Sequence, residues 1–199
     1  MMNAADIGDQ RTFSWRQRFR PGRKRDQGNV AVEFALTVPV LLLLLLASAE
    51  LGRFVLLNQK IDSVAVTLSE LVARAETISE SELDDIFEAA AQVASPFDID
   101  GRGRVILTSV INDDGNGPTI AWQRSGGGTL SATSEVGAEG GAAILPAGFA
   151  VREGETAIIS EAFFDFEPFL SDEIVAPRTL YRRAHHRPRL GTLDTIAAN

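Results

Sequence analysis

The chain has no cysteine, only two histidines and a single tyrosine among its 199 residues. Without cysteine it can form no disulfide, so an exported domain must rely on its own packing, and thiolate metal sites and cysteine nucleophiles are excluded. The sequence also lacks a Gly-X-Ser-X-Gly motif, a phosphate-cradling glycine loop and a histidine constellation for acid/base work. We therefore expect no catalytic residue, no cofactor and no metal ion, and predict that the protein is not an enzyme.

Two local patterns resemble metal sites but do not meet their requirements. The cluster Asp113-Asp114-Gly115-Asn116-Gly117 lacks the alternating oxygen ligands and the distal glutamate of a calcium loop, so it predicts a hairpin turn. His185 and His186 are adjacent, and neighbours in a strand point to opposite faces, so they are poorly placed to ligate one metal. With the arginines around them, they predict a basic, exposed C-terminal tail over residues 185–199.

Charge is divided between the two ends of the chain. Residues 1–28 carry a net charge of +4 and the remaining residues carry −12, which together give the formal net charge of −8. Positive charge just before a hydrophobic span keeps that side in the cytoplasm. We expect residues 1–28 to be a basic cytoplasmic leader and the long acidic portion to be exported.

A hydrophobic run follows the basic segment directly. From Val30 to Leu51 only four residues are polar, namely Glu33, Thr37, Ser48 and Glu50. A helix of this length spans about 33 Å, close to the thickness of a bilayer core. The run predicts a single transmembrane helix over residues 29–53, in which Pro39 is tolerated because neighbouring groups can satisfy the freed carbonyl.

Three interpretations of this segment remain open from its composition. It can be an uncleaved signal anchor, or a secretory signal cut after Ala49, because Ala47-Ser48-Ala49 has small residues where a signal peptidase reads them. The third interpretation takes Gly28 and Glu33 together. Their arrangement resembles type IV pilin-like precursors, in which a basic leader is removed after a glycine and the fifth mature residue is glutamate.

Glu33 is costly inside a span, by about 2.5 kcal/mol or more near the centre and less toward an interface. In an assembly of parallel spans, the new α-ammonium of Asn29 on a neighbouring copy could pair with this carboxylate and fix the register between subunits. Snorkelling to the headgroups is the simpler alternative, because Glu33 lies about one turn inside the span. Glu50, at the opposite end, needs only interfacial exposure.

The stretch Gly28-Asn29-Val30-Ala31-Val32-Glu33-Phe34-Ala35-Leu36, then Pro39, a leucine run and Glu50-Leu51-Gly52-Arg53, resembles the TadE-like pseudopilins of the tight-adherence (Flp) pilus system. Weaker similarity continues at residues 71–74, 159–168 and 187–190. The resemblance implies a pilin-like minor pilus assembly protein of the bacterial inner membrane, with its C-terminal domain periplasmic.

The resemblance also implies specific site residues and partners. Gly28 and Asn29 would form the processing site of a prepilin peptidase, and Glu33, Phe34 and Pro39 would contribute to assembly. Other pseudopilins or pilin and inner-membrane pilus assembly proteins would be further partners, and nucleic acid would not be one.

Beyond the span, the pattern predicts two amphipathic helices over residues 54–95. The first has an apolar face formed by Ile61, Val64, Ala65, Leu68, Leu71, Val72 and Ala75, with Ser69 among the polar residues opposite. Ser79 and Glu82 form a capping box at the start of the second helix, and Pro96 ends it.

Residues 96–184 predict a β-rich exported domain. Strand patterns occupy residues 104–112, 119–123, 156–166 and 178–184, separated by turn clusters. Helices followed by strands predict an α+β fold, with the long helix laid on a small antiparallel sheet. The glycine-rich residues 126–141 predict a surface loop, flexible at 126–128. A second functional hypothesis is therefore a membrane-anchored binding or sensor domain that recognises a ligand through this loop.

Overall fold

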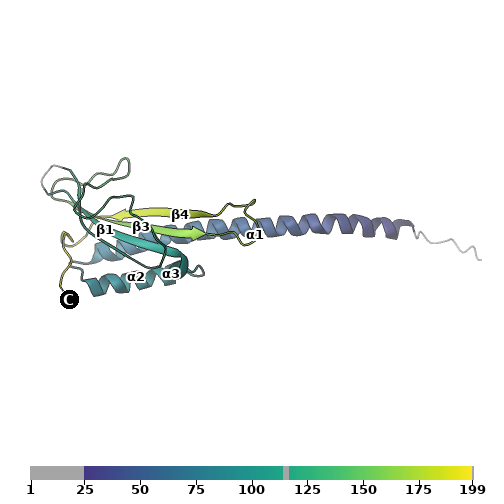
Figure 1. Ribbon diagram of the computed structural model, residues 1–199, viewed down its shortest axis with the longest axis horizontal. Coiled ribbons are helices and arrows are strands. Elements are labelled where there is room, and N and C mark those ends of the chain that lie inside the picture. The colour runs from purple at the N-terminus through teal and green to yellow at the C-terminus, as the bar shows by residue number, and fades with distance from the viewer. Residues whose placement is uncertain (1–24, 114–116, 199) are drawn as a thin grey trace, which may run out of the picture. The chain divides into compact units, whose positions relative to one another are not determined.

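The structure is a computed structural model, and it describes residues 25–113 and 117–198. The elements are α1 (Arg25–Arg74), α2 (Glu80–Ala94), α3 (Ile99–Arg102), β1 (Gly103–Ile111), β2 (Thr119–Gly126), β3 (Thr156–Phe166) and β4 (Arg178–His186) (Figure 1). The chain divides into two units, residues 1–43 and 44–199. The first contains the start of α1, and the second contains the rest of α1 and every other element.

The second unit has the predicted α+β fold, with the long helix packed on a four-stranded antiparallel sheet. The strand order is β2-β1-β3-β4, so β1 and β3 are central. The hairpin β1–β2 pairs Val105 with Gly126 and Ile111 with Thr119, with an irregularity between Ser109 and Val110. The strands predicted from the sequence are present. β3 has the predicted bounds, and β4 continues two residues further, to His186.

One face of the sheet is covered by the two longer helices. Sheet residues such as Leu107, Ile158 and Phe164 are buried with the apolar face of α1, which includes Leu57 and Ile61. Burial of each such aliphatic side chain contributes roughly 1.5–3 kcal/mol relative to leaving it exposed. This shared core fixes residues 57–73 of α1 against the sheet.

The start of α2 has the predicted capping box. The Glu82 N–H donates to the Ser79 hydroxyl, and the Glu82 carboxylate accepts from the Ser79 N–H at 2.8 Å. Helix α2 ends at Ala94, before Pro96, as predicted. It turns Leu83, Phe87 and other apolar residues toward the core. A cap of this kind contributes about 1 kcal/mol.

The other face of the sheet is covered by the connection between β2 and β3. Val136 and Val151 from this connection are buried with Ile120, Ala157 and Ile159 of the strands. Both faces of the sheet are therefore covered, which explains why nearly every residue of β3 is buried. A strand with both faces in a core reads as a continuous apolar run, as Ala157-Ile158-Ile159 does.

Three expectations about single segments are corrected by the packing. Ser69 is not on the solvent face of α1 but fully buried, and its hydroxyl lies 2.8 Å from Nδ1 of His186 in β4. The two histidines belong to β4 and not to a tail. They do point to opposite faces, since His186 meets Ser69 of α1 whereas the His185 ring lies 4.0 Å from the Phe149 ring, tilted by 45°.

The glycine segment after β2 is also more fixed than predicted. Gly126 lies against the Phe87 ring, and the Gly128 carbonyl accepts a hydrogen bond from the Arg104 guanidinium at 2.9 Å. Leu130 N–H donates to the Gly103 carbonyl at 2.9 Å. This part of the predicted flexible loop is therefore docked against α3 and the start of β1.

Candidate functional site

The first part of α1 is an apolar helical surface without a core of its own. Among the described residues there is one helix long and apolar enough to cross a membrane, and it begins at Asn29. Its large side chains are exposed, including Val30, Val32, Leu36 and the leucines at positions 41–46. An apolar surface of this extent marks a site of contact with a membrane or with other proteins.

The polar groups within this apolar stretch are largely satisfied inside the helix. The Thr37 hydroxyl donates to the Glu33 carbonyl at 2.8 Å, and the Ser48 hydroxyl donates to the Leu44 carbonyl at 2.7 Å. A hydroxyl that bonds back to the preceding turn needs no water. The helix is thus suited to apolar surroundings, with the Glu33 carboxylate as the exception.

The predicted processing and assembly residues all lie in α1. Gly28 and Asn29 are within its first turns, and Glu33, Phe34 and Pro39 follow on its exposed surface. Residues 1–24 of the predicted leader, which include most of its arginines, lie outside the described residues. The structure thus places the five predicted residues on one helix.

Glu50 differs from the expectation of simple interfacial exposure. Its side chain is only 2% exposed, and its Oε2 accepts a hydrogen bond from the backbone N–H of Phe169 at 3.1 Å. Its Oε1 lies 3.5 Å from Nε of Arg53 one turn later in α1. A buried carboxylate is tolerated when it is paired and hydrogen-bonded in this way. Glu50 therefore fastens the β3–β4 connection to α1.

Aromatic and cationic groups continue this attachment along α1. The Arg53 guanidinium donates to the Glu167 carbonyl and lies over the Phe166 ring, 5.1 Å from its centroid. Phe54 meets Phe166 edge-on at 5.1 Å, and the Arg178 guanidinium lies over the Phe54 ring, 5.2 Å from its centroid. These contacts place the end of β3 and the start of β4 at the level where the apolar stretch of α1 ends.

A second buried carboxylate lies under the β2–β3 connection. Glu161 in β3 is fully buried and accepts hydrogen bonds from the Ser134 hydroxyl, the Glu135 N–H at 2.9 Å and the Tyr181 hydroxyl at 2.9 Å. Burial, followed by the Glu161 charge, raises the pKa of Tyr181 well above its usual value. The three donors make Glu161 a structural tie between the connection and the sheet.

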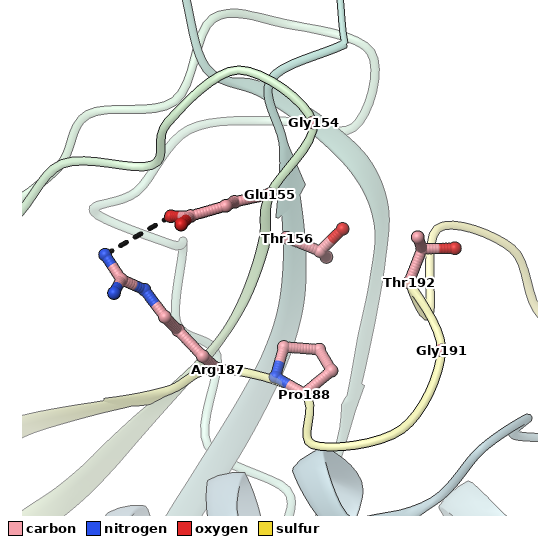
Figure 2. Close-up of a pocket in the computed structure, with 7 residues that line it drawn as sticks. All are labelled: Gly154, Glu155, Thr156, Arg187, Pro188, Gly191 and Thr192. Carbon is pink, nitrogen blue, oxygen red and sulfur yellow. Dashed lines mark ion pairs between the residues drawn. The ribbon is translucent and has the colours of Figure 1, made fainter.

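The cavity in Figure 2 lies at the opposite end of the sheet from Glu50. It has a volume of about 240 Å³ and is lined by residues 154–156, Arg187, Pro188, Gly191 and Thr192. In Figure 2 the Arg187 guanidinium points to the Glu155 carboxylate, at 3.4 Å. Arg187 also donates to the Ala150 carbonyl, so its charge and donors are already engaged by this chain.

No group of three or more histidine, cysteine or acidic side chains in the described residues could hold a metal ion. His185 and His186 face different sides of β4, as their contacts with Phe149 and Ser69 show. Burial, and then the neighbouring cationic groups, lower the pKa of His185. In the described residues, the candidate functional site is therefore α1 and the contacts at its junction with the sheet.

Sequence patterns did not reveal the partners of Glu50 and Glu161. Glu50 was expected to need only interfacial exposure, and nothing in the sequence identified Arg53 as its ion-pair partner or Phe169 as its donor. Glu161 sits inside an apolar strand, and an acid in such a run is a recognisable sign of a buried network. Its donors come from distant segments, which periodicity cannot identify.

Comparison with models of known families gives a match within α1. The model of the TadE-like protein family matches residues 28–67, the stretch on which the resemblance was recognised. This confirms the resemblance over that stretch. No curated protein and no solved structure is matched by the chain.

Proposed function

We propose that this chain, whose residues 28–67 match the TadE-like family, is a minor pseudopilin that helps to assemble a tight-adherence pilus. The observation that carries the proposal is the exposed apolar helix of residues 29–46, which has one carboxylate, Glu33, on its surface. Its role is structural and non-catalytic. Its partners are other pseudopilins or pilin and the inner-membrane proteins of pilus assembly.

The proposed maturation step is cleavage after Gly28 by a prepilin peptidase on the cytoplasmic side. The basic residues before Gly28 hold that end of the chain in the cytoplasm, and the acidic domain is exported. Cleavage gives Asn29 a free α-ammonium four residues before Glu33. In apolar surroundings the two charges on neighbouring copies neutralise each other, which offsets the cost of carrying either one alone.

Sequencing the mature N-terminus tests the maturation step. Asn29 as the first residue supports it. A start at Glu50 would mean secretion by signal peptidase, and an intact Met1 or Met2 would mean an uncleaved anchor. The last two results contradict the proposed processing.

Replacing Glu33 tests the assembly step. We expect Glu33→Leu and Glu33→Gln to abolish or strongly reduce pili while the protein stays in the membrane fraction, because both remove the charge that pairs with the α-ammonium. Glu88→Gln, an exposed glutamate on α2, is the matched control and should leave pili unchanged. Normal piliation with Glu33→Leu would mean that Glu33 only snorkels, as in a simple membrane-anchored binding domain.

A further inference from the structure

The connection between β3 and β4, residues 167–177, presents apolar side chains outward at its tip. Phe169 is 85% exposed, the largest fraction of any large hydrophobic side chain in the described part of the chain. Leu170 and Ile174 are exposed beside it. Burying such a ring is favourable, so a fixed loop that displays it marks a surface for apolar contact.

This loop is held at several points. The Phe169 N–H donates to the buried Glu50 carboxylate, and the Glu167 carbonyl accepts from Arg53. Val175, later in the loop, is buried in the main core. Since contacts fix the backbone on both sides of the tip, the fold itself keeps Phe169 exposed.

The loop descends along α1 toward the apolar stretch. Phe166 contacts Phe54 and Arg53, whereas Phe169 is bonded to Glu50, one turn earlier in the helix. Figure 1 shows the connection after β3 lying alongside α1. The next exposed leucines of α1 toward its start, Leu46 and Leu45, lie within the following turn and a half. The apolar tip of the loop is thus attached to α1 within a turn and a half of its exposed leucines.

The thickness of a bilayer places Glu50 and Phe169 at the level of the bilayer surface. The apolar core of a bilayer accommodates about 20 helical residues. A helix that enters it near Asn29 leaves it close to Glu50, the residue that holds Phe169. Arg53 and Arg178 lie just beyond, where cationic side chains reach lipid phosphates. Asp172 and Glu173, exposed in the same loop, limit the contact to a shallow one.

We propose that residues 169 and 170 insert into the outer-facing headgroup and acyl boundary of the membrane and form a second lipid contact beside α1. The proposal rests on the membrane anchoring in the proposed function and adds a contact that anchoring alone does not require. Glu50 and Arg53 couple the loop to α1, so the lipid contact lies at a fixed position along the helix.

A nitroxide label tests the proposal directly, since the chain has no native cysteine. We would label Phe169→Cys in the full chain, reconstituted in phosphatidylethanolamine and phosphatidylglycerol vesicles. Accessibility to oxygen and to a water-soluble nickel chelate then reports the depth of the label. Ile144→Cys is the matched control, an exposed apolar residue near the opposite end of the sheet. Leu42→Cys, in the apolar stretch, checks the anchor.

We expect the label at 169 to be more accessible to oxygen than to nickel, as at 42, and the label at 144 to show the reverse. Nickel accessibility at 169 equal to that at 144 overturns the loop proposal and leaves the anchor intact. Nickel accessibility at 42 equal to that at 144 overturns the anchor and the loop contact together. A label at 169 that is protected only after other pilus subunits are added identifies a protein contact and overturns the lipid proposal.

Discussion

At the scale of single residues, two buried carboxylates organise the sheet domain. Glu50 fastens the β3–β4 connection to α1, and Glu161 fastens the β2–β3 connection to β3. Each accepts hydrogen bonds from backbone N–H groups of segments far away in the sequence. Removing such an acceptor leaves a buried donor unsatisfied, which costs about 1–3 kcal/mol for each donor.

Tyr181 gives a prediction for alkaline pH. Its pKa is raised by burial and by Glu161, so the folded state holds the phenol proton more tightly than the unfolded chain, where it titrates near 10. The free energy of unfolding should therefore fall as the pH rises above about 10. Because Tyr181 is the only tyrosine, absorbance at the tyrosinate band follows this one group.

The Tyr181→Phe variant is the control for this dependence. It should lose about 1 kcal/mol at neutral pH, because the hydrogen bond to Glu161 is gone, and its alkaline decline should be shallower. An ordinary tyrosine titration in the folded protein, with its midpoint near pH 10, would contradict the assigned burial.

Glu50 gives a prediction about the loop. Glu50→Leu removes the acceptor of the Phe169 N–H, whereas Glu50→Gln keeps a side-chain oxygen in the same place. We expect a nitroxide at position 169 to become clearly more mobile with leucine and only slightly so with glutamine. If the nitroxide in both variants is as immobile as in the chain with Glu50, Val175 and Arg53 hold the loop without Glu50.

At the scale of elements, the connection after β2 depends on close backbone approach. Gly128 has a φ of +145°, and a Cβ there would lie 2.1 Å from the Gly103 carbonyl oxygen. The contact joins the connection to the start of β1. A side chain could be accommodated only by moving one of the two backbones.

The matched pair Gly128→Ala and Gly140→Ala tests this contact. Gly140 also has a positive φ, of +78°, but a Cβ there meets no atom within 4 Å. We expect Gly140→Ala to cost about 1 kcal/mol from backbone strain, and Gly128→Ala to cost several times more. Chemical denaturation followed by the buried Trp122 measures both, and equal costs would contradict the docked arrangement.

At the scale of the whole molecule, the core of the sheet domain begins well after the start of α1. The first buried apolar residue of α1 is Leu57, and Glu50 is the earliest buried residue of any kind in the described chain. The part of α1 before Glu50 is therefore not buried by this chain. A single long helix thus contains both the stretch that is long and apolar enough to cross a membrane and one layer of the domain.

Truncation tests this division. A chain that starts at Ser48 should remain soluble, since it keeps Glu50 and the entire core. Its free energy of unfolding should lie within about 1 kcal/mol of that of the full chain measured in detergent. A chain that starts at Ser63 deletes Leu57 and Ile61 and should not fold, because each such loss in a core costs about 2–5 kcal/mol. Circular dichroism distinguishes the two, and loss of folding in the longer chain would refute the division.

The sequence alone determined the features that depend on length, period and local caps. The apolar span, the capping box at Ser79, the hairpin and the bounds of β3 were all predicted, because each is encoded within a few neighbouring residues. The α+β order followed from the succession of those elements. Processing at Gly28 and pairing of Glu33 stay predictions, because their partners are other molecules.

Only the tertiary structure decided which polar residues are buried. Ser69 sits at a polar position of the helical pattern, yet β4 covers it through His186, and Glu50 meets a loop more than a hundred residues later. The glycines after β2 were expected to be flexible and are instead docked. Periodicity reports which face of an element is apolar, but it carries no information on which distant backbone group will satisfy a charge, and that pairing is settled only when the segments pack.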